Sequence, residues 1–134
     1  MKLPYLIAEI GVNFFDTAKV EKISPLEAAK KYIQEAKRSG ANAVKFQAYK
    51  ANTLASKYSP AYWDTSKETT KSQFELFSKF DSFGQSEFEE LSRYAHSIGV
   101  DFLCTPFDLD SVDYLSPLCN IFKISSSDLS NLNF

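Results

Sequence analysis

The sequence predicts an α/β fold of the parallel (β/α) TIM-barrel type, with about four strands, which is about half of an eight-stranded barrel. Short apolar segments alternate with helical segments, which is typical of a parallel sheet with right-handed crossovers. Each apolar segment also ends in polar or charged residues, and barrels of this type hold their chemistry at the carboxyl ends of the strands. The expected strand segments are Tyr5–Asn13, Ala43–Gln47, Asp101–Asp108 and Ile121–Asp128.

An open, doubly wound sheet is the other common arrangement of alternating strands and helices. Such sheets often bind their ligand through a Gly-rich loop, and the sequence has neither a G-x-G-x-x-G nor a P-loop pattern. A complete barrel needs about 250 residues, whereas this chain has 134. We therefore expect one domain that contains about half of a barrel.

Composition and charge exclude several classes of protein. Hydrophobic residues make up 44% and charged residues 24% of the chain, as in globular domains. The net charge of −2 provides no broad basic surface for nucleic acid or an anionic membrane. No apolar run reaches the roughly 18 residues that span a bilayer, and the N-terminus does not resemble a signal peptide. We therefore expect a cytoplasmic protein in which Cys104 and Cys119 are reduced core residues.

The helices are predicted from capping patterns and hydrophobic spacing. Ser24, Pro25 and Glu27 form a capping-box pattern, and the helix that they begin ends at Gly40. A short helix is expected over Ser72–Phe80. A longer helix then begins near Gly84 or Ser86, with Phe88, Leu91, Ala95 and Ile98 on its apolar face. Asp108 and Asp128 are interpreted as caps of further helices.

Two segments show no clear periodicity and are expected to be loops. The first covers residues 13–22 (NFFDTAKVEK), and the second is the long stretch Ala48–Thr70. Structureless loops of that length are uncommon in compact domains and are often functional. The aromatic side chains of the second segment either cover a ligand or pack the loop down; they are Tyr49, Tyr58, Tyr62 and Trp63.

Two lysines occupy similar positions on different expected strands. Lys45 and Lys123 each lie in an apolar frame, where an ammonium group is costly without an anion. If both face one cavity, they suit a phosphate or a carboxylate. The alternative is that each lysine pairs with a nearby carboxylate such as Glu9, or extends to water.

Other polar residues near the strand ends are candidates for chemistry. Glu9 could act as a general acid or base, or it could form an ion pair that only closes the barrel mouth. Thr105 and serines 125–127 supply hydroxyl groups of the kind that bind phosphate. His96 is expected to face solvent, and the sequence has no second histidine to make a metal pair.

Four motifs, in order and across nearly the whole chain, resemble the nonulosonic (sialic) acid synthase family. They are IAEIGVN, GANAVKFQ, CTPFD and FKISSSD, and the intervening SQFELF and SEFEEL segments also resemble that family. The resemblance implies a complete eight-stranded barrel and a condensation of phosphoenolpyruvate with N-acetylmannosamine or a related acetamido-hexose. The products would be a nonulosonic acid and phosphate. The resemblance also implies a homodimer for the full-length protein.

The resemblance assigns roles residue by residue. It implies that the phosphate and carboxylate of phosphoenolpyruvate are bound by Lys45, Thr105, Lys123 and Ser126. It also implies that Glu9 and Gln47 lie beside the reacting sugar, with Glu9 as the catalytic residue that handles a proton.

The chain departs from the family pattern in three respects. The family usually has Asn-His-Asn-Gly where this chain has Asn13–Asp16 (NFFD), a change that bears on the choice of sugar. It often has Ser-Gly where this chain has Ser126 and Ser127. Its divalent metal, Mn²⁺ or Mg²⁺, is held by two histidines from later strands, so we expect no metal ligands here. The resemblance further implies that residues 1–134 lack the C-terminal half-barrel and the antifreeze-like domain.

Two alternatives to this function are open. The chain could be a non-catalytic, truncated half-barrel that binds anions or only self-associates, because an open half-barrel leaves sheet edges unpaired. A different phosphoenolpyruvate-using barrel, such as an aldol synthase of aromatic amino-acid biosynthesis, would need better-matching motifs. If the chain is a synthase half-barrel, we expect no turnover by these 134 residues alone.

Overall fold

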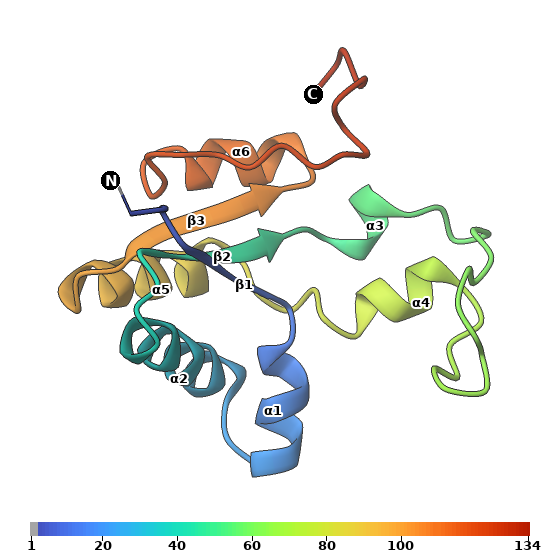
Figure 1. The fold of residues 1–134 in the computed structure, drawn as a ribbon. Coiled ribbons are helices and arrows are strands. Elements are labelled where there is room, and N and C mark those ends of the chain that lie inside the picture. Colours follow the sequence, from blue (N-terminus) through green and yellow to red (C-terminus); the bar gives the residue numbers. More distant parts are fainter. Residues whose placement is uncertain (1–2) are drawn as a thin grey trace.

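The computed structural model describes residues 3–134 and contains a three-stranded parallel sheet in the order β1-β2-β3. The strands are β1 (Ile7–Gly11), β2 (Ala43–Ala48) and β3 (Asp101–Pro106). The helices are α1 (Phe14–Glu21), α2 (Pro25–Arg38), α3 (Ala51–Leu54), α4 (Gln73–Ser78), α5 (Gln85–Ser97) and α6 (Leu109–Leu115). Figure 1 shows α2 and α5 along one side of the sheet and α6 beside β3. The expected α/β fold with parallel strands is confirmed.

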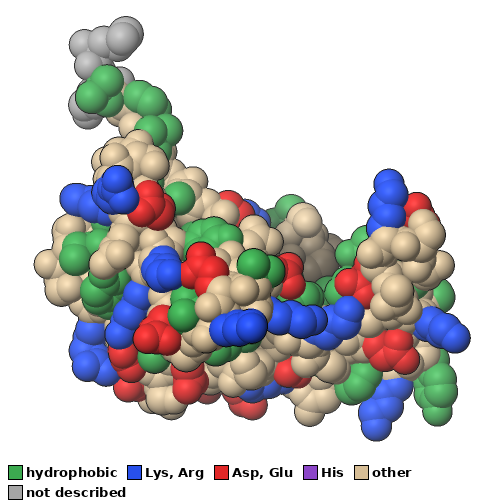
Figure 2. Space-filling view, turned by 90° about the horizontal axis from the view of Figure 1, so that it is seen from below, with side chains coloured by type: hydrophobic (Ala, Val, Ile, Leu, Met, Phe, Trp, Pro, Cys, Tyr) green, Lys and Arg blue, Asp and Glu red, His purple; other side chains and the backbone are tan. Residues whose placement is uncertain are grey.

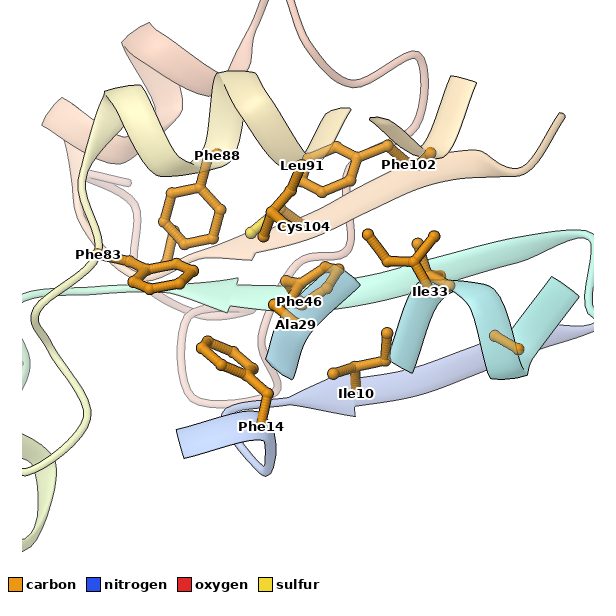
Figure 3. Close-up of a cluster of buried hydrophobic side chains, with 14 of the residues drawn as sticks. Ile10, Phe14, Ala29, Ile33, Phe46, Phe83, Phe88, Leu91, Phe102 and Cys104 are labelled. Atoms are coloured by element: carbon orange, nitrogen blue, oxygen red, sulfur yellow. The ribbon is translucent and has the colours of Figure 1, made fainter. Parts of the chain in front are cut away.

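Alternate residues of the strands make the hydrophobic core. Phe46 of β2 and Phe102 of β3 are buried, with ring centroids 5.7 Å apart. They lie among Ile33 of α2 and Leu91 of α5, as Figure 3 shows. Because successive side chains of a strand point to opposite faces, this packing directs the intervening residues of each strand to the other face of the sheet.

The two long helices form as the sequence predicts. Ser24 Oγ accepts a hydrogen bond from the backbone N–H of Glu27 at 3.1 Å, and the Glu27 carboxylate accepts one from the Ser24 N–H at 3.0 Å. This confirms the capping box at the start of α2. In α5 Phe88, Leu91 and Ala95 of the expected apolar face are buried, Ile98 just beyond the helix is partly buried, and His96 is exposed. The two cysteines are buried and unpaired, also as expected.

Helix α1 occupies a segment that was expected to be a loop, so that prediction is wrong. Phe14 and Ala18 lie four residues apart on one face of the helix and both are buried. The Phe14 ring centroid lies 4.9 Å from that of Phe83 and 5.8 Å from that of Phe46. Tertiary burial of this face stabilises the helix. Asn13 is a residue type that favours the N-cap position, but its side chain makes no capping hydrogen bond.

The fourth expected strand does not form. Segment 121–124 makes only an isolated parallel bridge, between Cys104 and Phe122. Ile121 and Ile124 are about half exposed, at 53% and 46%. Just beyond them, Ser125 Oγ accepts a hydrogen bond from the N–H of Ser127 at 3.3 Å. Local side-chain bonds of this kind compete with a strand ladder, and no further strand of the described residues covers the outer side of this segment.

The two aspartates that were interpreted as helix caps behave differently. Asp108 caps α6, because its Oδ1 accepts a hydrogen bond from the N–H of Ser111 at 2.7 Å. Asp128 lies within turns that cover residues 126–130, and in the described part of the chain no helix begins there. The expectation that Asp128 caps a helix is therefore wrong. Aspartate is favoured both at helix N-caps and in turns, so the residue type alone does not distinguish the two.

The connection between β2 and α4 is long but not structureless. It contains α3, and an antiparallel bridge joins Pro60 to Ser72. The prediction of a loop over Ala48–Thr70 is therefore only partly right. Figure 1 shows this connection, with α3 and α4, beyond the arrowheads of β2 and β3, which mark the carboxyl ends of the strands.

The carboxylate of Glu68 fastens this connection to the end of α4. Its Oε1 accepts hydrogen bonds from Lys79 Nζ at 2.7 Å and from the N–H and Oγ1 of Thr70 at 3.0 and 2.9 Å. The Lys79 ammonium, followed by the Thr70 groups, lowers the pKa of Glu68 to about 2. Trp63 Nε1 donates to the backbone carbonyl oxygen of Glu68 at 3.2 Å, so the single tryptophan of the sequence reports on this segment.

Charges of both signs are interspersed over the face shown in Figure 2. No helix of residues 3–134 is both long enough and apolar enough to cross a membrane.

We predict that lowering the pH destabilises the packing of the connection between β2 and α4, because protonation of Glu68 weakens its bonds to Lys79 and Thr70. Since its pKa is lowered in the folded chain, its stabilising contribution is complete above the ordinary value of about 4.5. That contribution is lost as the pH falls toward 2. Trp63 emission should shift over this range, and Glu68→Gln should show the shifted emission already at pH 7.

Glu89→Gln is the matched control, because it removes a carboxylate from α5, outside this connection. Its Trp63 emission should follow that of the unmodified chain. Identical pH profiles for Glu68→Gln and the unmodified chain would contradict the assignment, provided that far-ultraviolet circular dichroism shows the helices intact.

Candidate functional site

Four of the predicted site residues lie together on the sheet face opposite the core. Glu9 of β1 is in register with Lys45 of β2, and Gln47 of β2 is in register with Thr105 of β3. Lys45 Nζ forms an ion pair with Glu9 Oε2 and lies 3.4 Å from Thr105 Oγ1. Gln47 Nε2 donates to Glu9 Oε1 at 3.3 Å. The four side chains therefore form one polar cluster, which we call the strand-end cluster.

The burial of the ion pair is unequal. The Lys45 side chain is 16% exposed and the Glu9 side chain is 47% exposed. A largely buried ammonium needs an anionic partner, and here that partner lies at the solvent side. An incoming anion can take the place of Glu9 beside Lys45 and leave the carboxylate in water. The Lys45–Glu9 ion pair, one of the alternatives expected from the sequence, is therefore present. Its geometry also permits anion binding.

A β-bulge in β1 sets the geometry of this cluster. The register shifts between Glu9 and Gly11, where Gly11 rather than Ile10 pairs with Phe46. Gly11 has a φ of +57°, and a Cβ atom there would lie 3.3 Å from Gln47 Nε2. Bulges of this kind often lie beside active sites and redirect a side chain. The sequence analysis does not single out Gly11, although a glycine inside an expected strand is the signal for such a feature.

Lys123 and Ser126 are not part of the strand-end cluster. The bridge between Cys104 and Phe122 places Lys123 near the end of β3. Its ammonium, however, donates to the backbone carbonyl oxygen of Ile124, and the side chain is exposed. Ser126 is also exposed. Within residues 3–134, no hydrogen bond or ion pair joins either side chain to the cluster.

An open cavity of about 670 Å³ lies beside the strand-end cluster. Gln47 lines it and also bonds to Glu9, so the two regions share this residue. The connection between β2 and α4 supplies much of the wall, and the segment after the Cys104–Phe122 bridge contributes Ser127, Asp128 and Asn131. The sequence could not predict this cavity, because its walls come from segments far apart in the chain.

The aromatic residues of the connection divide into two groups. Tyr49 is buried, and its ring packs edge-on against Phe77 and Phe107 in the cavity wall. Burial, with a smaller effect of Asp81, raises the pKa of Tyr49, so the phenol is neutral at physiological pH. Tyr62 lines the cavity and is 75% exposed, whereas Tyr58 is 93% exposed and is not among the lining residues.

The described residues do not fit a metal ion. No group of three or more His, Cys, Asp or Glu side chains within residues 3–134 is arranged to hold one. Cys104 precedes Thr105 on β3, but it faces the core, where burial raises the pKa of its thiol well above the ordinary value. We therefore derive no step through a metal from these residues.

Comparison with known proteins identifies a family. A model of the NeuB family matches residues 32–134. The chain is 38% identical to an N,N'-diacetyllegionaminic acid synthase of Campylobacter jejuni, over all of this chain and 38% of that protein. It is 33% identical to a synthase of the same name from Legionella pneumophila, over 97% of this chain and 35% of that protein.

A solved structure shows the same relationship. The chain matches the N-acetylneuraminic acid (sialic acid) synthetase of Leptospira borgpetersenii with a TM-score of 0.76 and 28% identity, over 98% of this chain and 39% of that one. The human N-acetylneuraminate-9-phosphate synthase is 28% identical over 97% of this chain and 34% of that protein. The chain thus spans about a third of the length of the curated relatives it matches. It belongs to the NeuB family of sialic acid synthases, as its motifs indicated.

Proposed function

We propose that this chain forms the phosphoenolpyruvate-binding part of an enzyme that makes a nonulosonic (sialic) acid. The reaction would join phosphoenolpyruvate to N-acetylmannosamine or a related acetamido-hexose and release phosphate. The observation that carries the proposal is the position of Lys45, which lies largely buried between Glu9 and Thr105 on the face of the parallel sheet opposite the core. The names of the relatives, which are synthases of legionaminic acid and of a phosphorylated neuraminate, support the same class of reaction.

Phosphoenolpyruvate carries a phosphate and a carboxylate, and the strand-end cluster can neutralise part of this charge. Lys45 would exchange Glu9 for an oxygen of the ligand, and the Thr105 hydroxyl would donate a further hydrogen bond. A charge interaction gains strength in a site that is shielded from water. In this proposal Lys123 and Ser126 complete the anion site, which requires the Lys123 ammonium to leave the carbonyl oxygen of Ile124.

The proposed reaction balances with one water molecule. C3 of phosphoenolpyruvate attacks the sugar aldehyde carbon, a carbon–carbon bond forms, and the aldehyde oxygen takes up a proton. Water adds to C2 and loses one proton, which balances the proton taken up by the aldehyde oxygen. The C2–O bond to the phosphate then breaks, the C2 hydroxyl gives its remaining proton to the departing phosphate, and a 2-keto acid and phosphate result. Glu9, once released from Lys45, is placed to accept or donate a proton in these steps, while Gln47 orients it.

A second candidate function is anion binding without catalysis. The Lys45–Glu9 ion pair favours it, because Lys45 already has a charge partner and the cluster is satisfied without a substrate. Both candidates predict that phosphoenolpyruvate binds. They differ in whether the full-length protein then joins phosphoenolpyruvate to the sugar.

Replacing Lys45 by alanine tests the anion site directly. We expect titration calorimetry to show micromolar binding of phosphoenolpyruvate, which Lys45→Ala weakens about 30-fold or more, or ~2 kcal/mol, because a largely buried counter-charge is lost. Lys19→Ala is the matched control, since it removes an exposed lysine on α1 and changes the net charge equally. Equal losses in both variants would indicate a non-specific charge effect, and the absence of binding by a folded chain would refute the proposal.

Replacing Gly11 by alanine tests the β-bulge. The left-handed conformation costs an alanine about 1–2 kcal/mol, and the new Cβ would press on the Gln47 amide. Gly40→Ala is the control, because φ is +86° there and no atom lies within 4 Å of the added Cβ. Urea unfolding should show similar destabilisation in both variants. Only Gly11→Ala should weaken phosphoenolpyruvate binding, about fivefold (~1 kcal/mol), and equal affinities would contradict the role of the bulge.

The activity that we propose is that of the full-length protein. Since the chain spans about a third of the curated relatives, we expect no keto-acid product from it alone with Mn²⁺, phosphoenolpyruvate and N-acetylmannosamine. A chromatographic assay for the product checks this expectation, and product formation that Lys45→Ala abolishes would contradict it.

A further inference from the structure

The cavity beside Gln47 differs in charge from the strand-end cluster. Tyr62, Phe77, Phe80 and Phe107 give it an aromatic wall, and the amides of Gln73 and Asn131 supply polar groups. Asp128 is the one lining side chain that carries a charge at neutral pH, and no Lys, Arg or His is among the lining residues of the described chain. The cavity is therefore aromatic and polar, with a weakly acidic character.

The lysines at the ends of the neighbouring helices are held away from this cavity. Lys50, which precedes α3, donates to the carbonyl oxygens of Asp81 and Phe83 at 2.6 and 2.7 Å. Lys79, which follows α4, is bonded to Glu68 at 2.7 Å. These bonds direct both ammonium groups to partners elsewhere, so neither is positioned to neutralise an anion in the cavity.

Resting on the function proposed above, we infer that this cavity takes an uncharged, non-phosphorylated acetamido sugar and rejects a sugar phosphate. The relatives of this chain include synthases whose named products differ in this respect, a diacetyllegionaminic acid and a neuraminate 9-phosphate. The cationic part of the site, around Lys45, is assigned to phosphoenolpyruvate. Gln47 lies at the junction of the two parts, since it bonds to Glu9 and lines the cavity.

The lining chemistry suits such a sugar. Acetamido methyl groups and the C–H face of a sugar ring pack well on aromatic side chains. The amide N–H and the hydroxyl groups can donate to the Asp128 carboxylate and bond with the amides of Gln73 and Asn131. A phosphate group would bring about −1.5 to −2 charges beside Asp128, and no cation in the cavity would offset the loss of its hydration.

The experiment is a titration of the chain with two sugars in saturating phosphoenolpyruvate. The probes are N-acetylmannosamine and N-acetylmannosamine 6-phosphate, and the signal is the fluorescence of Trp63. Its ring centroid lies 5.0 Å from that of Tyr62 in the cavity wall. We expect the dissociation constant of the phosphorylated sugar to be at least about tenfold higher.

A charge variant tests the cause of the selectivity. Asn131→Lys places a cation at the cavity wall, and we expect it to tighten binding of the 6-phosphate about tenfold or more, with little change for the neutral sugar. Ser130→Lys is the matched control, because Ser130 is exposed and is not among the lining residues. It should leave the ratio of the two dissociation constants unchanged.

The outcomes separate this inference from the function on which it rests. If phosphoenolpyruvate binds through Lys45 but the two sugars bind equally, or the phosphate binds more tightly, the inference is wrong and the proposed function stands. Failure of the neutral sugar to bind while phosphoenolpyruvate binds also overturns the inference. If phosphoenolpyruvate does not bind to the folded chain, both fail together.

Discussion

The arrangement of this site depends on one ion pair, between Lys45 and Glu9. Phe46 must enter the core between α2 and α5, so the alternation of a strand places its neighbour Lys45 on the opposite face. An ammonium group at that depth requires an anion. Glu9 supplies it from the adjacent strand, and because Glu9 is more exposed than Lys45, the pair can open toward a ligand.

The β-bulge and the aromatic connection shape the surroundings of this ion pair. Gly11 allows β1 to turn away directly after Glu9, and it leaves room for Gln47. The connection between β2 and α4 then builds a cavity next to Gln47. The result is a site with the Lys45–Glu9 ion pair at one end and an aromatic, weakly acidic cavity at the other, as the proposed reaction between an anionic and an uncharged substrate would require.

Local sequence patterns predicted the structure correctly where the residues that determine an element lie close together in the chain. The capping box at Ser24 and the apolar face of α5 formed as expected, since both depend on residues within a few positions of each other. The predicted polar residues of β1, β2 and β3 also came together, because they occupy paired positions on one face of neighbouring parallel strands. Helix α1 was missed, since its stability comes from burial of Phe14 among aromatic rings that lie distant in the sequence.

The sequence alone determined the parallel α/β class, the family, and the presence of Glu9, Lys45, Gln47 and Thr105 at the strand ends. The alternation of apolar strand segments with helical segments and the four family motifs suffice for these conclusions. Only the tertiary structure decided that segment 121–124 forms a single bridge, that Lys123 lies outside the cluster, and that Gln47 adjoins a cavity whose lining, among residues 3–134, includes no lysine, arginine or histidine. These features depend on which distant segments lie side by side and on where long side chains find partners, and no local pattern encodes either.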